Sequence, residues 1–192
     1  YYPENIIENS RSLLSKEHTH YIVNVMRLKR GSKINFFNKK GEWLSEIVFL
    51  DRDRVEIKFL NKIKESFPAS NIELAICLVK KNPMEIILQK ATELGVSRII
   101  PIISERTEVK DLNLERANKI TIEATEQSDQ LNPPKISQMI DLKNFINSIS
   151  KETKLFFADI NSKHTPSSKD MEGIKNISIL IGPEGDFSPS ER

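Results

Sequence analysis

The hydrophobic pattern of this 192-residue chain changes at a polar stretch that contains Pro68, residues 61–71. Before it lie short runs in which apolar and polar residues alternate, as in strands with one face in water. After it, continuous apolar runs alternate with segments of helical periodicity, as in parallel sheets covered by helices. We therefore expect a mainly antiparallel β domain at 1–62, a linker at 63–71 and an α/β domain at 72–192.

The N-terminal part predicts one helix and three antiparallel strands. Ser15 is a suitable N-cap for a helix over residues 15–27, in which Ile22, Val25 and Met26 share one face. Polar turns separate three strand-like runs, Lys33–Phe37, Glu42–Leu50 and Arg54–Leu60. Short antiparallel strands with a single helix are typical of a small β-barrel.

The C-terminal part predicts a mostly parallel sheet with helices between its strands. The expected strands are Ile72–Val79, Arg98–Ile103, Lys154–Ala158 and Asn176–Ile181. One helix has Asn82 as N-cap, Pro83 as its first residue, an apolar stripe that ends at Leu94, and Gly95 beyond its end. Two more helices are expected, near Leu114–Ser128 and after Asp141, the latter with Ile146 facing inward.

Composition narrows the function classes. The 29 Lys and Arg against 27 Asp and Glu leave a net charge of +2, so any nucleic-acid contact must be local. A single cysteine, Cys77, reads as an inert core thiol, and with three scattered histidines it gives no reason to expect a metal site. The apolar stretches are too short to span a membrane, which predicts a soluble, cytoplasmic protein.

The strand Asn176–Ile181 runs directly into a loop with the sequence GPEGDF, residues 182–187. Ligands of α/β proteins bind where strands end at the carboxyl edge of the sheet, and glycines allow close backbone approach. Glu184 and Asp186 make the loop acidic, which favours a ligand with a positive or neutral reacting part over a nucleoside triphosphate. An ordinary tight turn is the alternative interpretation.

A capping box at Ser188–Glu191 predicts that a helix begins after this loop. The printed sequence stops at Arg192, one residue later. A single helical turn is not stable by itself. We therefore expect the α/β domain to be incomplete at its C-terminus in this chain.

Positions 27–40 carry a cluster of basic side chains with Phe36 and Phe37 between them and no acid. The cluster consists of Arg27, Lys29, Arg30, Lys33, Lys39 and Lys40. Phosphate contacts with a stacking aromatic residue would suit RNA. The alternative is a solvated face with phenylalanine in the core, and since neighbours in a strand point to opposite faces, one of the pair must point inward.

Arg106 follows the expected strand Arg98–Ile103, and Glu123 and Gln127 share one helix face at i,i+4 spacing. One interpretation gathers the three side chains around a pocket. The other gives a loop arginine and solvated helix charges.

Three blocks occur in order along the chain. They are KKNPMEIILQKATELGVSRIIPIISERTEV (Lys80–Val109), EATEQS (Glu123–Ser128) and LIGPEGDFSPSE (Leu180–Glu191). Together with the stretch His20–Gly31, they closely resemble the ribosomal RNA small subunit methyltransferase E family over nearly the whole chain.

The resemblance implies a PUA-like RNA-binding β-barrel followed by a SPOUT-type α/β domain with a C-terminal trefoil knot. It also implies S-adenosylmethionine as the methyl donor, a homodimer, and methylation of N3 of one uridine in the decoding region of 16S rRNA in the small ribosomal subunit. The implied donor-binding residues are Ile181, Gly182, Pro183, Glu184 and Gly185. The RNA-binding candidates are Arg27, Lys29, Arg30, Lys81 and Gln127.

Our mechanistic hypothesis is that an arginine, Arg106, stabilises a developing uracil anion while a carboxylate or water takes the N3 proton, with Glu123 as the candidate base. The chain departs from the family in three ways. Asp186 replaces a usual glycine, Gln130 replaces an expected arginine, and the final segment that completes the knot and donor pocket lies outside the printed sequence. A chain without that segment is expected to lack activity.

Two alternatives stay open at this point. One is a non-catalytic RNA-binding or ribosome-assembly protein that retains the fold. The other is an α/β enzyme of a different kind, such as a nucleotide-binding hydrolase, which the acidic loop disfavours.

Overall fold

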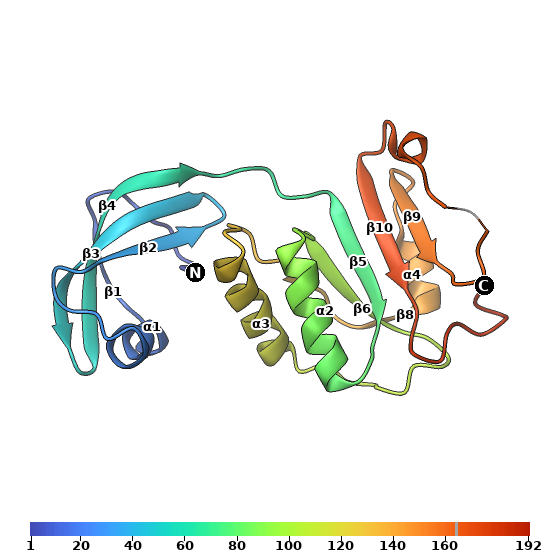
Figure 1. Ribbon diagram of the computed structural model, residues 1–192, viewed down its shortest axis with the longest axis horizontal. Coiled ribbons are helices and arrows are strands. Elements are labelled where there is room, and N and C mark those ends of the chain that lie inside the picture. Colours follow the sequence, from blue (N-terminus) through green and yellow to red (C-terminus); the bar gives the residue numbers. More distant parts are fainter. Residues whose placement is uncertain (164) are drawn as a thin grey trace. The chain divides into compact units, whose positions relative to one another are not determined.

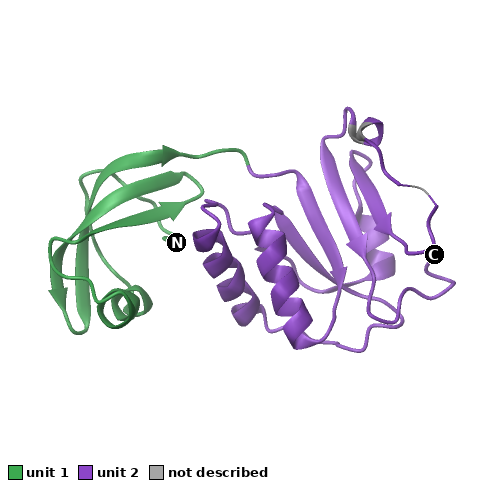
Figure 2. Cartoon of the chain, in the orientation of Figure 1, with its two compact units in different colours: residues 1–68 green, residues 69–192 purple. Residues whose placement is uncertain are grey.

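The computed structural model describes residues 1–163 and 165–192, which form two compact units, Tyr1–Pro68 and Ala69–Arg192 (Figure 2). Strand β4 (Arg54–Glu65) enters the stretch expected to be a linker, because Lys62 and Lys64 still pair with strand β3. The linker expected from residue 63 is thus strand up to Glu65.

Unit 1 is an antiparallel sheet in the order β1-β4-β3-β2 (Figure 1). Its strands are β1 (Arg11–Leu13), β2 (Lys33–Asn38), β3 (Gly41–Asp51) and β4 (Arg54–Glu65). The edge strands β1 and β2 do not pair with each other among the described residues. The segment before β1 spans between them, with the Tyr2 N–H donating to the Phe37 carbonyl of β2 at 2.8 Å. Alternate side chains of β3 and β4, including Ile47, Ile57 and Phe59, fill the core of unit 1.

The helix of unit 1 changes its geometry midway. α1 (Lys16–His20) begins as predicted, with the Ser15 hydroxyl accepting the backbone N–H of His18 at 3.2 Å. A π-helical turn, Tyr21–Val25, then continues it. The predicted apolar face is therefore wrong in part: Ile22 is buried, but Val25 is 58% exposed and Met26 42%. A π turn has a wider repeat, which moves later residues off the face that α-helical spacing gives them.

Unit 2 is a parallel sheet in the order β7-β6-β5-β10-β9, with β8 also pairing with β6. Its strands are β5 (Ile72–Cys77), β6 (Arg98–Ile103), β7 (Lys135–Ile136), β8 (Ile140–Asp141), β9 (Thr153–Ala158) and β10 (Asn176–Ile181). Its helices are α2 (Lys81–Glu93), α3 (Leu114–Gln127), α4 (Leu142–Ser148) and the short 3-10 helix Ser168–Met171. The predicted parallel α/β architecture is confirmed.

Helices cover both faces of this sheet (Figure 1). Leu74 and Ile76 of β5 pack with α2 and α3, whereas Ala75 and Cys77 pack with α4. Because successive side chains of a strand point to opposite faces, β5 is apolar on both faces from Leu74 to Cys77. The parallel strands also bring their carboxyl ends, and the loops that follow, to one edge.

Three helix predictions need correction. α2 begins two residues before the expected start: Lys80 is its N-cap and Pro83 lies in the first turn, where backbone N–H groups have no partner inside the helix. Leu94 is the C-cap and is 83% exposed, while Gly95, at φ +79°, ends the helix as predicted. Ile146 of α4 is 43% exposed.

Within the residues described, none of the helices has the length and apolar character needed to cross a membrane.

Candidate functional site

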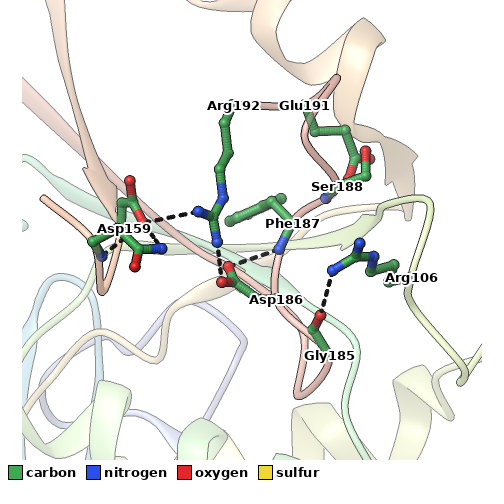
Figure 3. Close-up of polar contacts among 9 residues, drawn as sticks. Arg106, Asp159, Gly185, Asp186, Phe187, Ser188, Glu191 and Arg192 are labelled. Atoms are coloured by element: carbon green, nitrogen blue, oxygen red, sulfur yellow. Dashed lines mark hydrogen bonds and ion pairs between the residues drawn. The ribbon is translucent and has the colours of Figure 1, made fainter.

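The loop after β10, Gly182–Asp186, lies at the carboxyl edge of the unit 2 sheet (Figure 3). The backbone N–H of Asp186 donates to the carbonyl of Pro183 at 3.0 Å and closes a turn. Phe187 follows; it is 1% exposed and packs on Phe157 with ring centroids 4.8 Å apart. A Cβ on Gly182 would lie 2.6 Å from the Phe187 ring, so this close packing requires glycine.

This loop is tied to the loop that follows β6. Arg106 Nη1 donates to the carbonyl of Gly185 at 3.1 Å (Figure 3). The backbone N–H of Glu105 donates to Glu191 Oε1 at 2.8 Å. Strand β5 separates β6 from β10 in the sheet. The two contacts therefore reach across the end of β5 and fix one loop against the other.

The segment that predicts a helix forms a turn here. Glu191 Oε2 accepts the backbone N–H of Ser188 at 3.0 Å, which is half of the expected capping box. The Ser188 hydroxyl bonds instead with the hydroxyl of Ser190 at 2.9 Å. Glu191 thus uses one carboxylate oxygen on its own segment and the other on the neighbouring loop.

The two acids of the loop differ in their surroundings. The Asp186 carboxylate accepts the backbone N–H of Phe187 at 2.7 Å and also pairs with Arg192. Glu184 is exposed, and within residues 1–163 and 165–192 it has no hydrogen bond or ion pair. Glu184 therefore supplies the uncompensated negative charge of the loop.

Cys77, at the end of β5, lies beneath these loops beside Ser104 and Thr107. Burial raises the pKa of its thiol, and hydrogen bonds with those two hydroxyls offset the effect in part. A buried thiol with a raised pKa is a poor nucleophile, in line with an inert core role. In the described part of the chain, His, Cys, Asp and Glu side chains form no group of three or more that could hold a metal ion.

Glu123 and Gln127 lie away from Arg106. Both line a groove of about 460 Å³ between α2 and α3, whose described lining does not include Arg106. A bidentate pair between Arg116 and Glu85 crosses this groove, with Nη2–Oε2 at 3.1 Å, and its hydrogen bonds lower the pKa of Glu85. α3 leads from the carboxyl edge of the sheet, so Glu123 lies two helical turns beyond Arg116, about 10 Å along the axis. The structure does not bring the three side chains into one pocket.

The basic cluster of unit 1 lies on the surface. Arg27, Lys29, Arg30 and Lys33 are exposed and form no ion pair with a described residue. Arg27 adopts a left-handed conformation, φ +51°, at the bend between the π turn and β2. Of the two neighbouring aromatic side chains, Phe36 is buried and Phe37 is partly exposed, so one points inward as predicted.

Two other predicted positions lie in unit 2. Lys81 is exposed at the start of α2. Gln130, which stands where the resemblance leads us to expect an arginine, lies beside Gly95 beyond the other end of α2. The substitution at Gln130 is therefore remote from the Gly182–Asp186 loop.

Sequence reasoning missed the contacts made by Glu105, Asp159 and Arg192. Glu105 and Glu191 lie within blocks that resemble the family, but the resemblance assigns no contact to either, and Asp159 and Arg192 lie outside these blocks. Glu105 meets Glu191, and Asp159 meets Arg192, through the order of the strands.

Comparisons with known proteins agree with this geometry. Residues 14–60 match the RNA methyltransferase PUA domain, and residues 65–192 match the RNA methyltransferase domain. The fold and the loop at the carboxyl edge thus define an RNA methyltransferase with an N-terminal PUA domain.

The ribosomal RNA small subunit methyltransferase E of Rickettsia conorii is 30% identical over 197 residues, which cover 100% of this chain and 80% of that protein. The Bacillus subtilis enzyme of the same name is 30% identical over 93% of this chain and 75% of its own length. The chain belongs to the ribosomal RNA small subunit methyltransferase E family.

A solved structure of that enzyme from Neisseria gonorrhoeae, bound to S-adenosylmethionine, superposes with a TM-score of 0.90 at 28% identity, over 100% of this chain and 81% of that one. A methyltransferase from Legionella pneumophila, also in complex with this cofactor, superposes with a TM-score of 0.83 at 26% identity. The match covers 98% of this chain and 81% of that one.

Proposed function

We propose that this protein transfers the methyl group of S-adenosylmethionine to N3 of a uridine in the decoding region of 16S rRNA, on the assembled small ribosomal subunit. The observation that carries the proposal is the Gly182–Asp186 loop, held at the carboxyl edge of a sheet that matches solved S-adenosylmethionine-bound relatives.

The residues of the loop suit this donor. We name Gly182–Asp186 the donor loop, and we propose that Ile181 to Gly185 bind the donor. The loop has no basic side chain to bind phosphate, and Glu184 offers an unpaired negative charge. When bound, the donor supplies an electrophilic methyl group on a positively charged sulfur.

The negative charge of Glu184 should attract the positively charged sulfur of the donor. We expect Glu184→Gln to weaken binding of S-adenosylmethionine by several-fold and to leave the affinity for S-adenosylhomocysteine, whose sulfur is neutral, nearly unchanged. Isothermal titration calorimetry with both ligands measures the ratio. Equal losses for the two ligands would show that Glu184 acts through loop structure rather than through charge.

We propose that Arg106 stabilises the anion that forms as uracil N3 loses its proton, and that Glu123 takes that proton. Within one chain Glu123 lies in a different groove from Arg106, so the two act on one uracil only if Glu123 comes from the second protomer of the proposed homodimer. Glu123→Gln preserves the size of the side chain and removes the base. With Glu123 as base, turnover should fall by about 100-fold or more while donor affinity stays unchanged. Single-turnover rates with saturating donor measure the effect, and an unchanged rate removes Glu123 from the mechanism.

The remaining proposals concern the RNA and the assembly. Arg27, Lys29 and Arg30 of unit 1 and Lys81 and Gln127 of unit 2 would contact 16S rRNA, and all are exposed. By its resemblance to the family we further propose a cytoplasmic homodimer with a trefoil knot. In this proposal the RNA-binding domain corresponds to unit 1, Tyr1–Pro68, and the methyltransferase domain to unit 2, Ala69–Arg192.

The direct test uses the protein expressed from its own gene, radiolabelled S-adenosylmethionine and small subunits that lack the modification. Because an N3 methyl group blocks the pairing edge of uracil, reverse transcriptase stops at the methylated position. We expect one stop at a decoding-region uridine. Donor binding without label on 16S rRNA would refute the proposed substrate, and absence of both would favour a non-catalytic assembly role.

A further inference from the structure

Asp186 occupies a backbone conformation that disfavours most residues. Its φ is +59°, in the left-handed region where glycine is the least strained choice. Aspartate is among the few other residues that tolerate this region, since its short side chain bonds to nearby backbone. Here Asp186 Oδ1 accepts the N–H of Phe187 at 2.7 Å. The turn of the donor loop is thus held by a side chain rather than left to a flexible glycine.

The other oxygen of Asp186 connects the donor loop to the loop after β9. Asp186 Oδ2 accepts a hydrogen bond from Arg192 Nη2, and Arg192 Nη1 lies 3.8 Å from Asp159 Oδ1 (Figure 3). With its amide oxygen turned toward Arg192, Asn161 accepts from Nη1 at 2.6 Å. We name Asp159, Asp186 and Arg192 the acid–arginine latch.

The latch completes a two-sided attachment of the donor loop. In the sheet, β10 lies between β5 and β9. Arg106 and Glu191 already connect the loop toward β6, on one side, through the Gly185 carbonyl and the Glu105 N–H. The latch connects it toward β9 on the other side. Asp186 and Gly185, adjacent in sequence, carry the two attachments.

We propose that Asp186 is a positioning residue for the methyl donor: through the latch it fixes the backbone of the donor loop, and its pairing with Arg192 leaves Glu184 as the unpaired carboxylate of that loop. The inference rests on the proposed function for its ligand. It goes beyond that function by giving a role to the side chain that replaces the usual glycine.

Two substitutions isolate the latch. Asp186→Asn tolerates the left-handed backbone and still accepts the Phe187 N–H, but it removes the charge that Arg192 binds. Arg192→Gln removes the same pair from the other side, while Arg192→Lys keeps the charge. Arg98→Gln is the matched control, because it breaks an ion pair of similar exposure, 3.4 Å from Glu73, at the amino edge of the sheet.

In the free protein, hydrogen exchange of the amides of residues 182–187 measures how often the donor loop opens. Calorimetry measures donor affinity. We expect Asp186→Asn and Arg192→Gln each to speed exchange severalfold and to weaken donor binding by about fivefold. This change lies at the upper end of the range measured for exposed ion pairs. The double variant should be no worse than either single one, Arg192→Lys should recover most of the affinity, and Arg98→Gln should match the wild type.

Additive losses in the double variant, or wild-type exchange and affinity in Asp186→Asn, would overturn the latch. A wild-type protein that binds no donor would refute the proposed function instead. In that case exchange of the loop amides decides whether the latch exists, because it needs no ligand.

Discussion

Replacing Gly182 with alanine is expected to weaken binding of S-adenosylmethionine by at least about tenfold. A Cβ at this position would lie 2.6 Å and 2.9 Å from two carbons of the Phe187 ring. The ring is buried against Phe157, so it has no free space to move into. Overpacking of this kind costs about 1–3 kcal/mol, and the exposed donor loop is the part of the structure most able to shift in response. Calorimetry gives the donor affinity, and thermal unfolding gives the stability.

Two further variants test the steric cause. Gly185→Ala places a Cβ 3.8 Å from the Arg106 side chain, an ordinary contact, so its loss of affinity should be clearly smaller. Combining Gly182→Ala with Phe187→Leu removes the ring and should restore part of the affinity. Wild-type donor binding and melting temperature in Gly182→Ala would show that the Phe187 ring does not determine the loop.

Replacing Arg106 with glutamine is expected to lower turnover by about 100-fold, the range for removal of a group that stabilises charge in a transition state. Arg106 is exposed at the carboxyl edge of the sheet and donates to the Gly185 carbonyl at 3.1 Å. Loss of this one exposed hydrogen bond should weaken donor binding by less than about fivefold. The larger loss should therefore appear in kcat, measured at saturating donor and small subunit.

The pH dependence separates a charge effect from a loss of structure. A nearby guanidinium stabilises the uracil anion and so lowers the apparent pKa of N3, which ordinarily lies above neutrality. Removing it raises that pKa, so the deficit of Arg106→Gln should be largest near pH 7 and should shrink as the pH rises. The same deficit at every pH would contradict the proposed role, and Arg106→Lys, which keeps the charge, should lose less than the glutamine variant.

Local periodicity in the sequence determined the longer strands and the position of the donor loop, but not the short strands β1, β7 and β8. Asn176–Ile181 was predicted with the bounds that β10 has, because four of its six residues are apolar, as expected of a strand buried on both faces. Ser15, Asp141 and Gly95 marked helix ends correctly, since caps and left-handed turns depend on neighbours in the chain. The same local reasoning failed where the helix of unit 1 widened into a π turn at Tyr21.

Only the tertiary structure decided which loops meet. Arg106 and Gly185 are 79 residues apart, and Glu105 and Glu191 are 86 apart. Their contacts depend on the strand order β6-β5-β10-β9, which the apolar pattern of each strand leaves open. For the same reason the sequence left open whether Glu123 and Gln127 share a pocket with Arg106, and the structure shows that α3 carries them away from the carboxyl edge. Periodicity specifies which face of an element is buried, whereas a binding site is made by elements that the fold brings together from distant parts of the chain.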